Sequence, residues 1–201
     1  ILAIFKEHNL NAISFKGPTL TLRLYGDISR RQFGDLDILI RIEDMQKALE
    51  LLQAEGYQLD YYLNEKQSAV FLKSAHHHHF SNPNIGITVE IHWRISGSMY
   101  SSRLDLDKLW NRAEVVTVYG KEVLSFSAID TLQVLCEHGA RHNWDRLSWI
   151  CDIALLAKVK DLDWPAIFKQ PDISKNEHQI LLGLSLANKL FSTPLPLEVL
   201  K

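Results

Sequence analysis

The stretch F-G-D-L-D-I-L-I, residues 33–40, constrains the fold and chemistry of this chain more than any other. Its apolar residues predict a buried strand, yet Asp35 and Asp37 stand two positions apart within it. Because side chains alternate between the two faces of a strand, both carboxylates share one face and Leu36 and Ile38 share the other. The aliphatic face belongs to a core, so the carboxylates point at a cleft or at solvent.

A second predicted strand, I-T-V-E-I-H-W at residues 87–93, places Glu90 and His92 on one face by the same parity. If the two strands are neighbours, three carboxylates converge. Mg²⁺ takes oxygen ligands and is completed by water and substrate phosphates, so such an array suits one or two divalent cations. The alternative for an isolated D-x-D is a solvated strand edge or a turn. The flanking I-L-I argues against a turn.

A strand, Lys16-Gly17 and a helix beginning near Pro18 precede this stretch. Glycine lets the backbone approach a ligand closely, and a helix N-terminus presents free N–H groups to phosphate. The two segments together therefore favour a site for a phosphorylated ligand.

These residues carry a resemblance to a known family. S-F-K-G-P-T-L followed by R-R-Q-F-G-D-L-D-I-L-I resembles the active-site motif of the DNA polymerase β-type nucleotidyltransferase superfamily, and more narrowly a bacterial family of uncharacterised nucleotidyltransferases. V-E-I-H-W and the segment from Asp130 to Leu156 agree with it. The resemblance covers roughly residues 10–158.

The resemblance implies a role for each matching position. Asp35, Asp37 and Glu90 would bind Mg²⁺, with Mn²⁺ as the alternative ion, and Glu90 would help to deprotonate an acceptor hydroxyl. That hydroxyl attacks the α-phosphate of a nucleoside triphosphate as pyrophosphate leaves. Gly17 would be the phosphate-binding turn. The cationic candidates for the phosphates are Lys16 and Arg31.

We therefore expect a nucleotidyltransferase that moves a nucleoside monophosphate, with AMP from ATP as the first choice, to a hydroxyl. The formal net charge of -2 favours a small-molecule or protein acceptor over a long nucleic acid. Pro18 departs from the superfamily, which usually has Ser there, and removes a hydroxyl and an N–H. The alternative is accordingly a nucleotide-binding or partner-binding module of the same fold with weak or lost turnover.

The predicted fold is α+β: a polymerase β-like mixed sheet with flanking helices in residues 1–126, and a helical C-terminal domain in residues 127–201. The expected strands after residue 56 are 57–62, 69–72, 87–93 and a hairpin turning at Tyr119-Gly120. The expected helices are 1–8, one from Pro18, 43–55, one near 106–112, 127–139, 143–158 and 176–191, with breaks near Gly139, Pro165 and Pro171.

The histidines allow two interpretations each. The run His76–His79 predicts a solvated hairpin tip, with a substrate or metal contact as the alternative. His138 and His142 have the i, i+4 spacing of a zinc pair, but H-E-x-x-H is absent, which argues against a zinc hydrolase. They are either hydrogen-bonded helix-end residues or part of an acceptor side. The residues proposed for that acceptor side are His92, His138, His142, Arg146 and Asp152.

The composition also indicates the cellular compartment in which this chain works. Two cysteines without a metal-type pair favour a reducing, cytoplasmic compartment. No apolar run approaches the ~20 residues that span a bilayer. The chain opens in an apparent helix without Met, so we expect a fragment that lacks its natural start.

Overall fold

The computed structural model describes residues 1–98, 104–159, 162, 164–167, 176–195, 197 and 199. Its internal contacts divide the chain into two compact units. The first comprises residues 1–23, 27–101 and 114–125, and the second comprises 24–26, 102–113 and 126–201. An independent helical domain starting at residue 127 stays a prediction.

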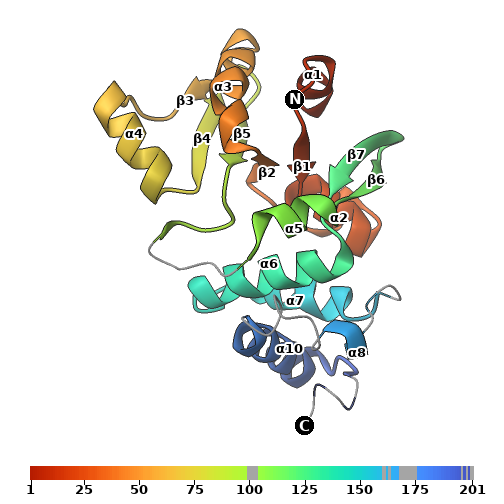
Figure 1. Cartoon of the computed structure of the whole chain (residues 1–201). Coiled ribbons are helices and arrows are strands. Elements are labelled where there is room, and N and C mark those ends of the chain that lie inside the picture. Colours follow the sequence, from red (N-terminus) through yellow and green to blue (C-terminus); the bar gives the residue numbers. More distant parts are fainter. Residues whose placement is uncertain are drawn as a thin grey trace. The chain divides into compact units, whose positions relative to one another are not determined.

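One mixed sheet of seven strands, in the order β3-β4-β5-β2-β1-β7-β6, organises the first unit (Figure 1). β1 and β7 are parallel, as are β2 and β5, and the other neighbours are antiparallel. The bounds of the strands are β1 Ala12–Ser14, β2 Asp35–Ile40, β3 Gln58–Leu59, β4 His77–Asn82, β5 Ile87–His92, β6 Glu114–Val118 and β7 Lys121–Ser125. The predicted mixed sheet with flanking helices, followed by a helical C-terminal part, is confirmed.

The aliphatic face of this sheet forms the core of the first unit. Ile38 and Ile40 of β2 are buried there with Val89 and Ile91 of β5, and Leu36 packs against them. The helices that contribute to this core are α1 (Leu2–Glu7), α3 (Met45–Ala54) and α4 (Glu65–Ser74). The parity predicted for the first strand is therefore confirmed, and its two Asp residues lie on the opposite face.

The prediction of a strand at residues 69–72 is wrong, because A-V-F-L lies inside α4. Asn64 starts this helix with a capping box: its side chain accepts from the Gln67 backbone N–H, and the Gln67 side chain accepts from the Asn64 N–H. The predicted strand 57–62 shortens to Gln58–Leu59. A four-residue apolar run does not separate helix from strand, and here the cap decides.

The prediction that the histidine run forms a hairpin tip is also wrong. His77, His78 and His79 belong to β4, and the turn follows at residues 83–86. His78 is 5% exposed and stacks on Phe71 with a centroid separation of 5.1 Å. Its Nδ1 lies 2.8 Å from the hydroxyl of Tyr61. The run has the period of a strand: His78 alternates onto the core face.

This burial predicts a pH-dependent stability. Burial lowers the pKa of His78 to about 4, against about 6.5 in an unfolded chain. Between these pH values the unfolded state binds more protons at His78, so the free energy of unfolding falls as the pH falls. The pKa of His77 is likewise about 4 and acts in the same direction. His78→Phe removes one of the two contributions, so the midpoint of thermal unfolding should fall less steeply with acidification than in the unaltered chain. An unchanged slope would contradict this assignment.

The second unit is helical (Figure 1). Its helices are α5 (Leu106–Asn111), α6 (Ala128–Arg141), α7 (Leu147–Leu156), α8 (Trp164–Ile167) and α10 (Glu177–Phe191). α6, α7 and α10 pack against one another. None of the described helices combines the length and the apolar character needed to cross a bilayer.

The predicted break near Gly139 falls slightly later, because α6 continues through Gly139 to Arg141 and α7 begins at Leu147. The predicted break around Pro165 is the short helix α8, and Pro171 lies outside the described residues.

Candidate functional site

The two carboxylate-bearing stretches are neighbours in the sheet. β2 and β5 run parallel with Asp37 opposite Glu90 and Asp35 opposite Thr88. The side chain of Asp37 is 3% exposed and that of Glu90 is 19% exposed. Glu90 therefore does not point into the core, and the sheet brings the predicted carboxylates to one face.

His92 lies between two of these carboxylates. Its Nε2 is 3.3 Å from Oδ1 of Asp37 and 3.1 Å from Oε2 of Glu90. Burial disfavours a charged imidazole, but the hydrogen bonds to Asp37 and Glu90 outweigh it and raise the pKa of His92. The sequence assigned His92 to an acceptor side, whereas the structure places it among the carboxylates.

Lys16 contributes a positive charge to this cluster. Its Nζ donates to Oδ1 of Asp37 at 2.9 Å. Burial opposes ionisation of Asp37, yet Lys16 and His92 hold the pKa of this carboxyl well below its usual range. Burial likewise opposes ionisation of Glu90, and the hydrogen bond from His92 lowers its pKa to about 2. Both carboxylates are thus ionised at neutral pH.

Asp35 differs from both. Its side chain makes no hydrogen bond or ion pair with any described residue. Its pKa is raised, first by burial and then by repulsion from Asp37 and Glu90. A half-buried carboxylate beside two others is what a divalent cation would stabilise, and the oxygen ligands are of the type that Mg²⁺ takes. The oxygen donors of Asp37 and Glu90 fit Mg²⁺, but the close donor group among the described residues is Asp37, Glu90 and His92 and does not include Asp35.

Gly17 is fixed by its surroundings. Its φ is +52°, and a Cβ added there would lie 3.0 Å from the carbonyl oxygen of Asp35. The turn that begins α2 (Gly17–Tyr25) consequently lies directly against β2. The hydroxyl of Thr19, the next one after Pro18, is buried and hydrogen-bonded to Ser14 at 2.7 Å. It therefore does not replace the hydroxyl absent at Pro18.

Arg31, the other candidate for binding phosphate, is not in the sheet. Arg31 follows a short 3₁₀ turn, Ile28–Arg30, in the loop before β2.

In the second unit the rings of His138 and His142 are 4.7 Å apart, and Trp149 contacts both. Arg146 lies over the Trp149 ring at 5.6 Å. Asp152 is fully buried and accepts a hydrogen bond of 2.8 Å from Tyr25. An acceptor role for these residues stays a prediction.

Two groups among the described residues place three metal-type side chains close together. They are Asp37, Glu90 and His92, and His76, His77 and His92. Neither group of three contains His138 or His142. For the histidine run, a substrate or metal contact was only the alternative prediction, and the structure places Nε2 of His77 3.6 Å from Oε1 of Glu90. The sequence did contain a signal for this contact. His77 and His79 share one strand face, as do Glu90 and His92, and the two strands are neighbours with these residues opposite each other.

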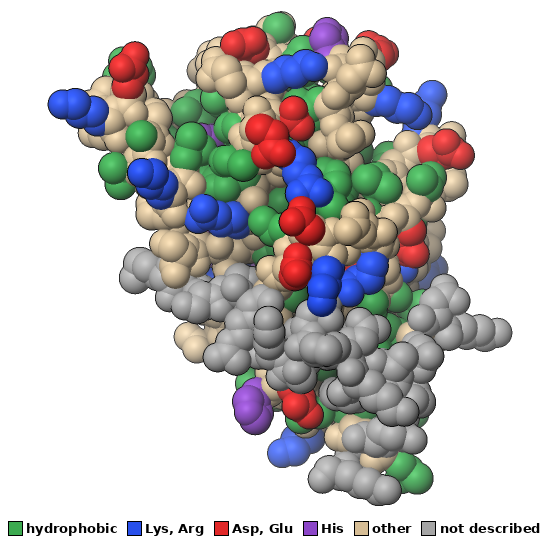
Figure 2. Space-filling view, viewed as in Figure 1, with side chains coloured by type: hydrophobic (Ala, Val, Ile, Leu, Met, Phe, Trp, Pro, Cys, Tyr) green, Lys and Arg blue, Asp and Glu red, His purple; other side chains and the backbone are tan. Residues whose placement is uncertain are grey.

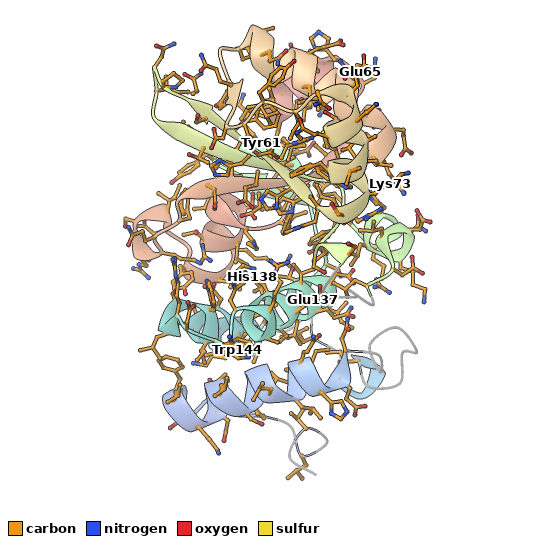
Figure 3. All side chains as sticks on the ribbon, turned by 90° about the vertical axis from the view of Figure 1, so that its left-hand side faces the viewer. Tyr61, Glu65, Lys73, Glu137, His138 and Trp144 are labelled. Carbon is orange, nitrogen blue, oxygen red and sulfur yellow. The ribbon has the colours of Figure 1, made fainter. Side chains whose placement is uncertain are left out.

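Figure 3 shows Glu137 and His138 on α6 and Trp144 in the turn that follows. Trp144 carries a buried polar atom, Nε1, that has no hydrogen-bond partner among the described atoms.

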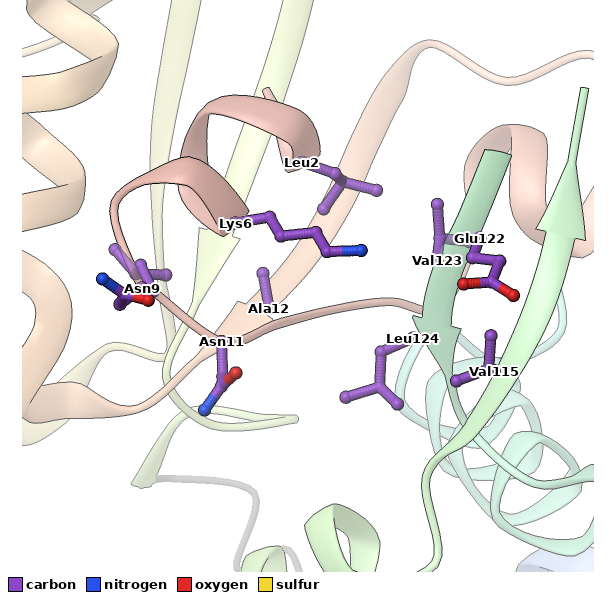
Figure 4. Close-up of a pocket in the computed structure, with 10 residues that line it drawn as sticks. Leu2, Lys6, Asn9, Asn11, Ala12, Val115, Glu122, Val123 and Leu124 are labelled. Atoms are coloured by element: carbon purple, nitrogen blue, oxygen red, sulfur yellow. The ribbon is translucent and has the colours of Figure 1, made fainter. Parts of the chain in front are cut away.

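The first unit also has a pocket of about 490 Å³ between α1, β1 and the β6–β7 hairpin (Figure 4). Lys6 and Glu122 line it, together with Leu2, Val115 and Leu124. None of the predicted catalytic or nucleotide-binding residues lines this pocket.

On the face drawn in Figure 2, basic and acidic side chains are interspersed among the described residues.

The sequence matches the profile of the uncharacterised nucleotidyltransferases over residues 1–192. The chain belongs to this family. No protein of curated function matches it significantly.

Two solved structures are similar in fold. A crystal structure of ANT(2'')-Ia in complex with adenylyl-2''-tobramycin is 12% identical, with 92% of each chain covered and a TM-score of 0.55. An antigenic nucleotidyltransferase-like protein from Paracoccidioides brasiliensis is 17% identical, with 94% of this chain and 88% of that chain covered and a TM-score of 0.56. Family and fold together support nucleotidyl transfer as the general activity.

Proposed function

We propose that this chain is a Mg²⁺-dependent nucleotidyltransferase that moves AMP from ATP to a hydroxyl of a small molecule or a protein and releases pyrophosphate. The observation that carries the proposal is the cross-strand pair Asp37 and Glu90 with Asp35 beside it, whose pKa is raised by burial and by repulsion from the other two carboxylates. Mn²⁺ is the alternative ion.

In this proposal Asp35, Asp37 and Glu90 bind the divalent cation. The ion would stabilise the charge that develops on the attacking and leaving oxygens. Glu90 takes the proton of the acceptor hydroxyl, whose oxygen forms a bond to the α-phosphorus while the bond to pyrophosphate breaks. Lys16 now neutralises Asp37, and it is positioned to turn to a phosphate once a cation binds that carboxylate.

The nucleotide and the acceptor class have separate support. One solved structure of the same fold, ANT(2'')-Ia, contains an adenylylated small molecule, adenylyl-2''-tobramycin. A net charge of -2 and interspersed surface charges favour such an acceptor, or a protein, over a long nucleic acid. Cys136 and Cys151 are both free thiols, which suits a cytoplasmic setting.

The test is transfer of label from each α-labelled nucleoside triphosphate, with Mg²⁺ or Mn²⁺, into small molecules and proteins of a cell extract. We expect label from ATP in one acceptor, dependent on the metal ion. Asp35→Asn and Asp37→Asn should abolish the labelling. Asp44→Asn is the matched control, because Asp44 stands at the start of α3 and its side chain makes no capping hydrogen bond.

The ion pair of Lys16 with Asp37 favours one alternative, a nucleotide-binding module that no longer turns over, because Lys16 occupies an oxygen of a proposed metal ligand. Metal-dependent ATP binding without labelling of any acceptor and without pyrophosphate would support that module and contradict the transferase.

A further inference from the structure

Three imidazoles gather where β4 begins and β5 ends. His77 is the register partner of His92, and His76 immediately precedes β4. The ring centroids are 4.4 Å apart for His76 and His77, and 5.0 Å apart for His77 and His92. One ligand nitrogen of each of the three rings lies within 4.8 Å of the others. The backbone therefore brings together three nitrogen donors that are separated by up to 16 positions in the sequence.

Two of these rings carry a buried nitrogen that is not used. The side chain of His92 is 3% exposed, and its Nδ1 has no hydrogen-bond partner among the described atoms. Nδ1 of His77 is also buried and has no hydrogen-bond partner among the described atoms. A buried polar atom without a partner is costly, so two such atoms in adjacent rings indicate a missing ligand.

The other nitrogen of each ring faces a carboxylate. Nε2 of His92 contacts Asp37 and Glu90, and Nε2 of His77 lies 3.6 Å from Glu90. Metal-binding histidines usually give their second ring nitrogen to a carboxylate or carbonyl, which fixes the ring and makes it a stronger ligand. His77 and His92 already have this arrangement.

We infer that His76, His77 and His92 form a binding site for a transition-metal ion of the zinc type. Three imidazoles suit zinc and its neighbours in the first transition row, whereas Mg²⁺ prefers oxygen ligands. Three protein ligands also leave a fourth position open for water or for a group of a bound molecule. The site goes beyond the proposed nucleotidyl transfer, because it uses nitrogen donors and a different class of metal ion.

The test is titration of the full chain with Zn²⁺ alone, followed by calorimetry. We expect one zinc ion per chain, and affinity at least about tenfold lower in His76→Ala and in His77→Ala, which corresponds to about 1.4 kcal/mol. His79→Ala is the matched control: it shortens the same histidine run, but His79 contacts Asp60 and is outside the cluster. Its zinc affinity should stay within about twofold of the unaltered chain.

A second readout keeps the proposal testable if a variant is destabilised. Zinc should raise the thermal unfolding midpoint of the unaltered chain and of His79→Ala, but not of His77→Ala or His77→Gln. Asp35→Asn should bind zinc normally while it loses Mg²⁺-dependent nucleotide transfer, so failure of one site is distinguishable from failure of the other.

Three results would overturn the zinc site. The first is equal zinc affinity in the unaltered chain and in His77→Ala. The second is a loss of zinc affinity in His79→Ala as large as in His77→Ala, as expected for nonspecific binding to a histidine run. The third is displacement of zinc by excess Mg²⁺.

Discussion

Replacing Glu90 by Gln is expected to lower kcat for nucleotidyl transfer by about 10²–10⁴-fold, the usual contribution of a general base. The amide keeps the size of the side chain and can still accept the hydrogen bond from His92, so the local packing should persist. What is lost is a charged oxygen beside Asp37 that can take a proton from the acceptor. Nucleotide affinity should change much less than kcat, since the phosphate-binding candidates Lys16 and Gly17 are untouched.

The measurement is pyrophosphate release with the acceptor identified by labelling, together with direct binding of ATP in the presence of Mg²⁺. Glu43→Gln is the control, an exposed acid on a 3₁₀ turn away from the carboxylate face. Loss of ATP binding in Glu90→Gln would instead make Glu90 purely a metal ligand. An unchanged kcat would remove it from the mechanism altogether.

The face of each carboxylate could be predicted from the sequence, because it follows from parity alone. Asp35 and Asp37 had to share a face, and Leu36 and Ile38 had to occupy the other. That the two strands are neighbours, with Asp37 opposite Glu90, does not follow from periodicity. It depends on a crossover between distant segments, and only the family resemblance indicated it.

The charges around the carboxylates could not be predicted. Lys16 was expected to meet phosphates, and His92 to face an acceptor, but both contact Asp37. Each of these contacts depends on side-chain rotamers and on the register of neighbouring strands, neither of which a linear pattern specifies. The carboxylates repel one another, and the nearest cationic and imidazole groups compensate this repulsion.

The histidine run shows the same limit for the fold. His78 was expected at a solvated tip, because the histidine run lies between a predicted strand and the loop S-N-P-N-I-G. The structure buries it against Phe71 and Trp93, with its Nδ1 close to the hydroxyl of Tyr61. A neutral imidazole with one hydrogen-bond partner can pack in a core as an aromatic residue does. A prediction based on the polarity of histidine places it at the surface instead.

The second large effect is expected from Gly139→Ala, which should destabilise the helical unit by about 1–3 kcal/mol, the usual range for overpacking. A Cβ at Gly139 would lie 2.4 Å from the Trp144 ring, and one at Gly183 would lie 2.8 Å from Sγ of Cys136 and 2.9 Å from the same ring. The indole thus fills a space that α6 and α10 leave by having no side chain at these two positions.

The sign of the change in the free energy of unfolding distinguishes the two effects expected at Gly139, overpacking against Trp144 and a gain in helix propensity. Gly139 is inside α6, where alanine is intrinsically better than glycine by roughly 0.8–1.0 kcal/mol, so a helix without the Trp144 contact would be stabilised. Urea unfolding and amide hydrogen exchange in α6 and α10 should instead report destabilisation. Gly34→Ala is the control, because a Cβ there meets nothing within 4 Å. Stabilisation by Gly139→Ala would contradict the packing of Trp144 against Gly139, because only the helix propensity of alanine would then remain.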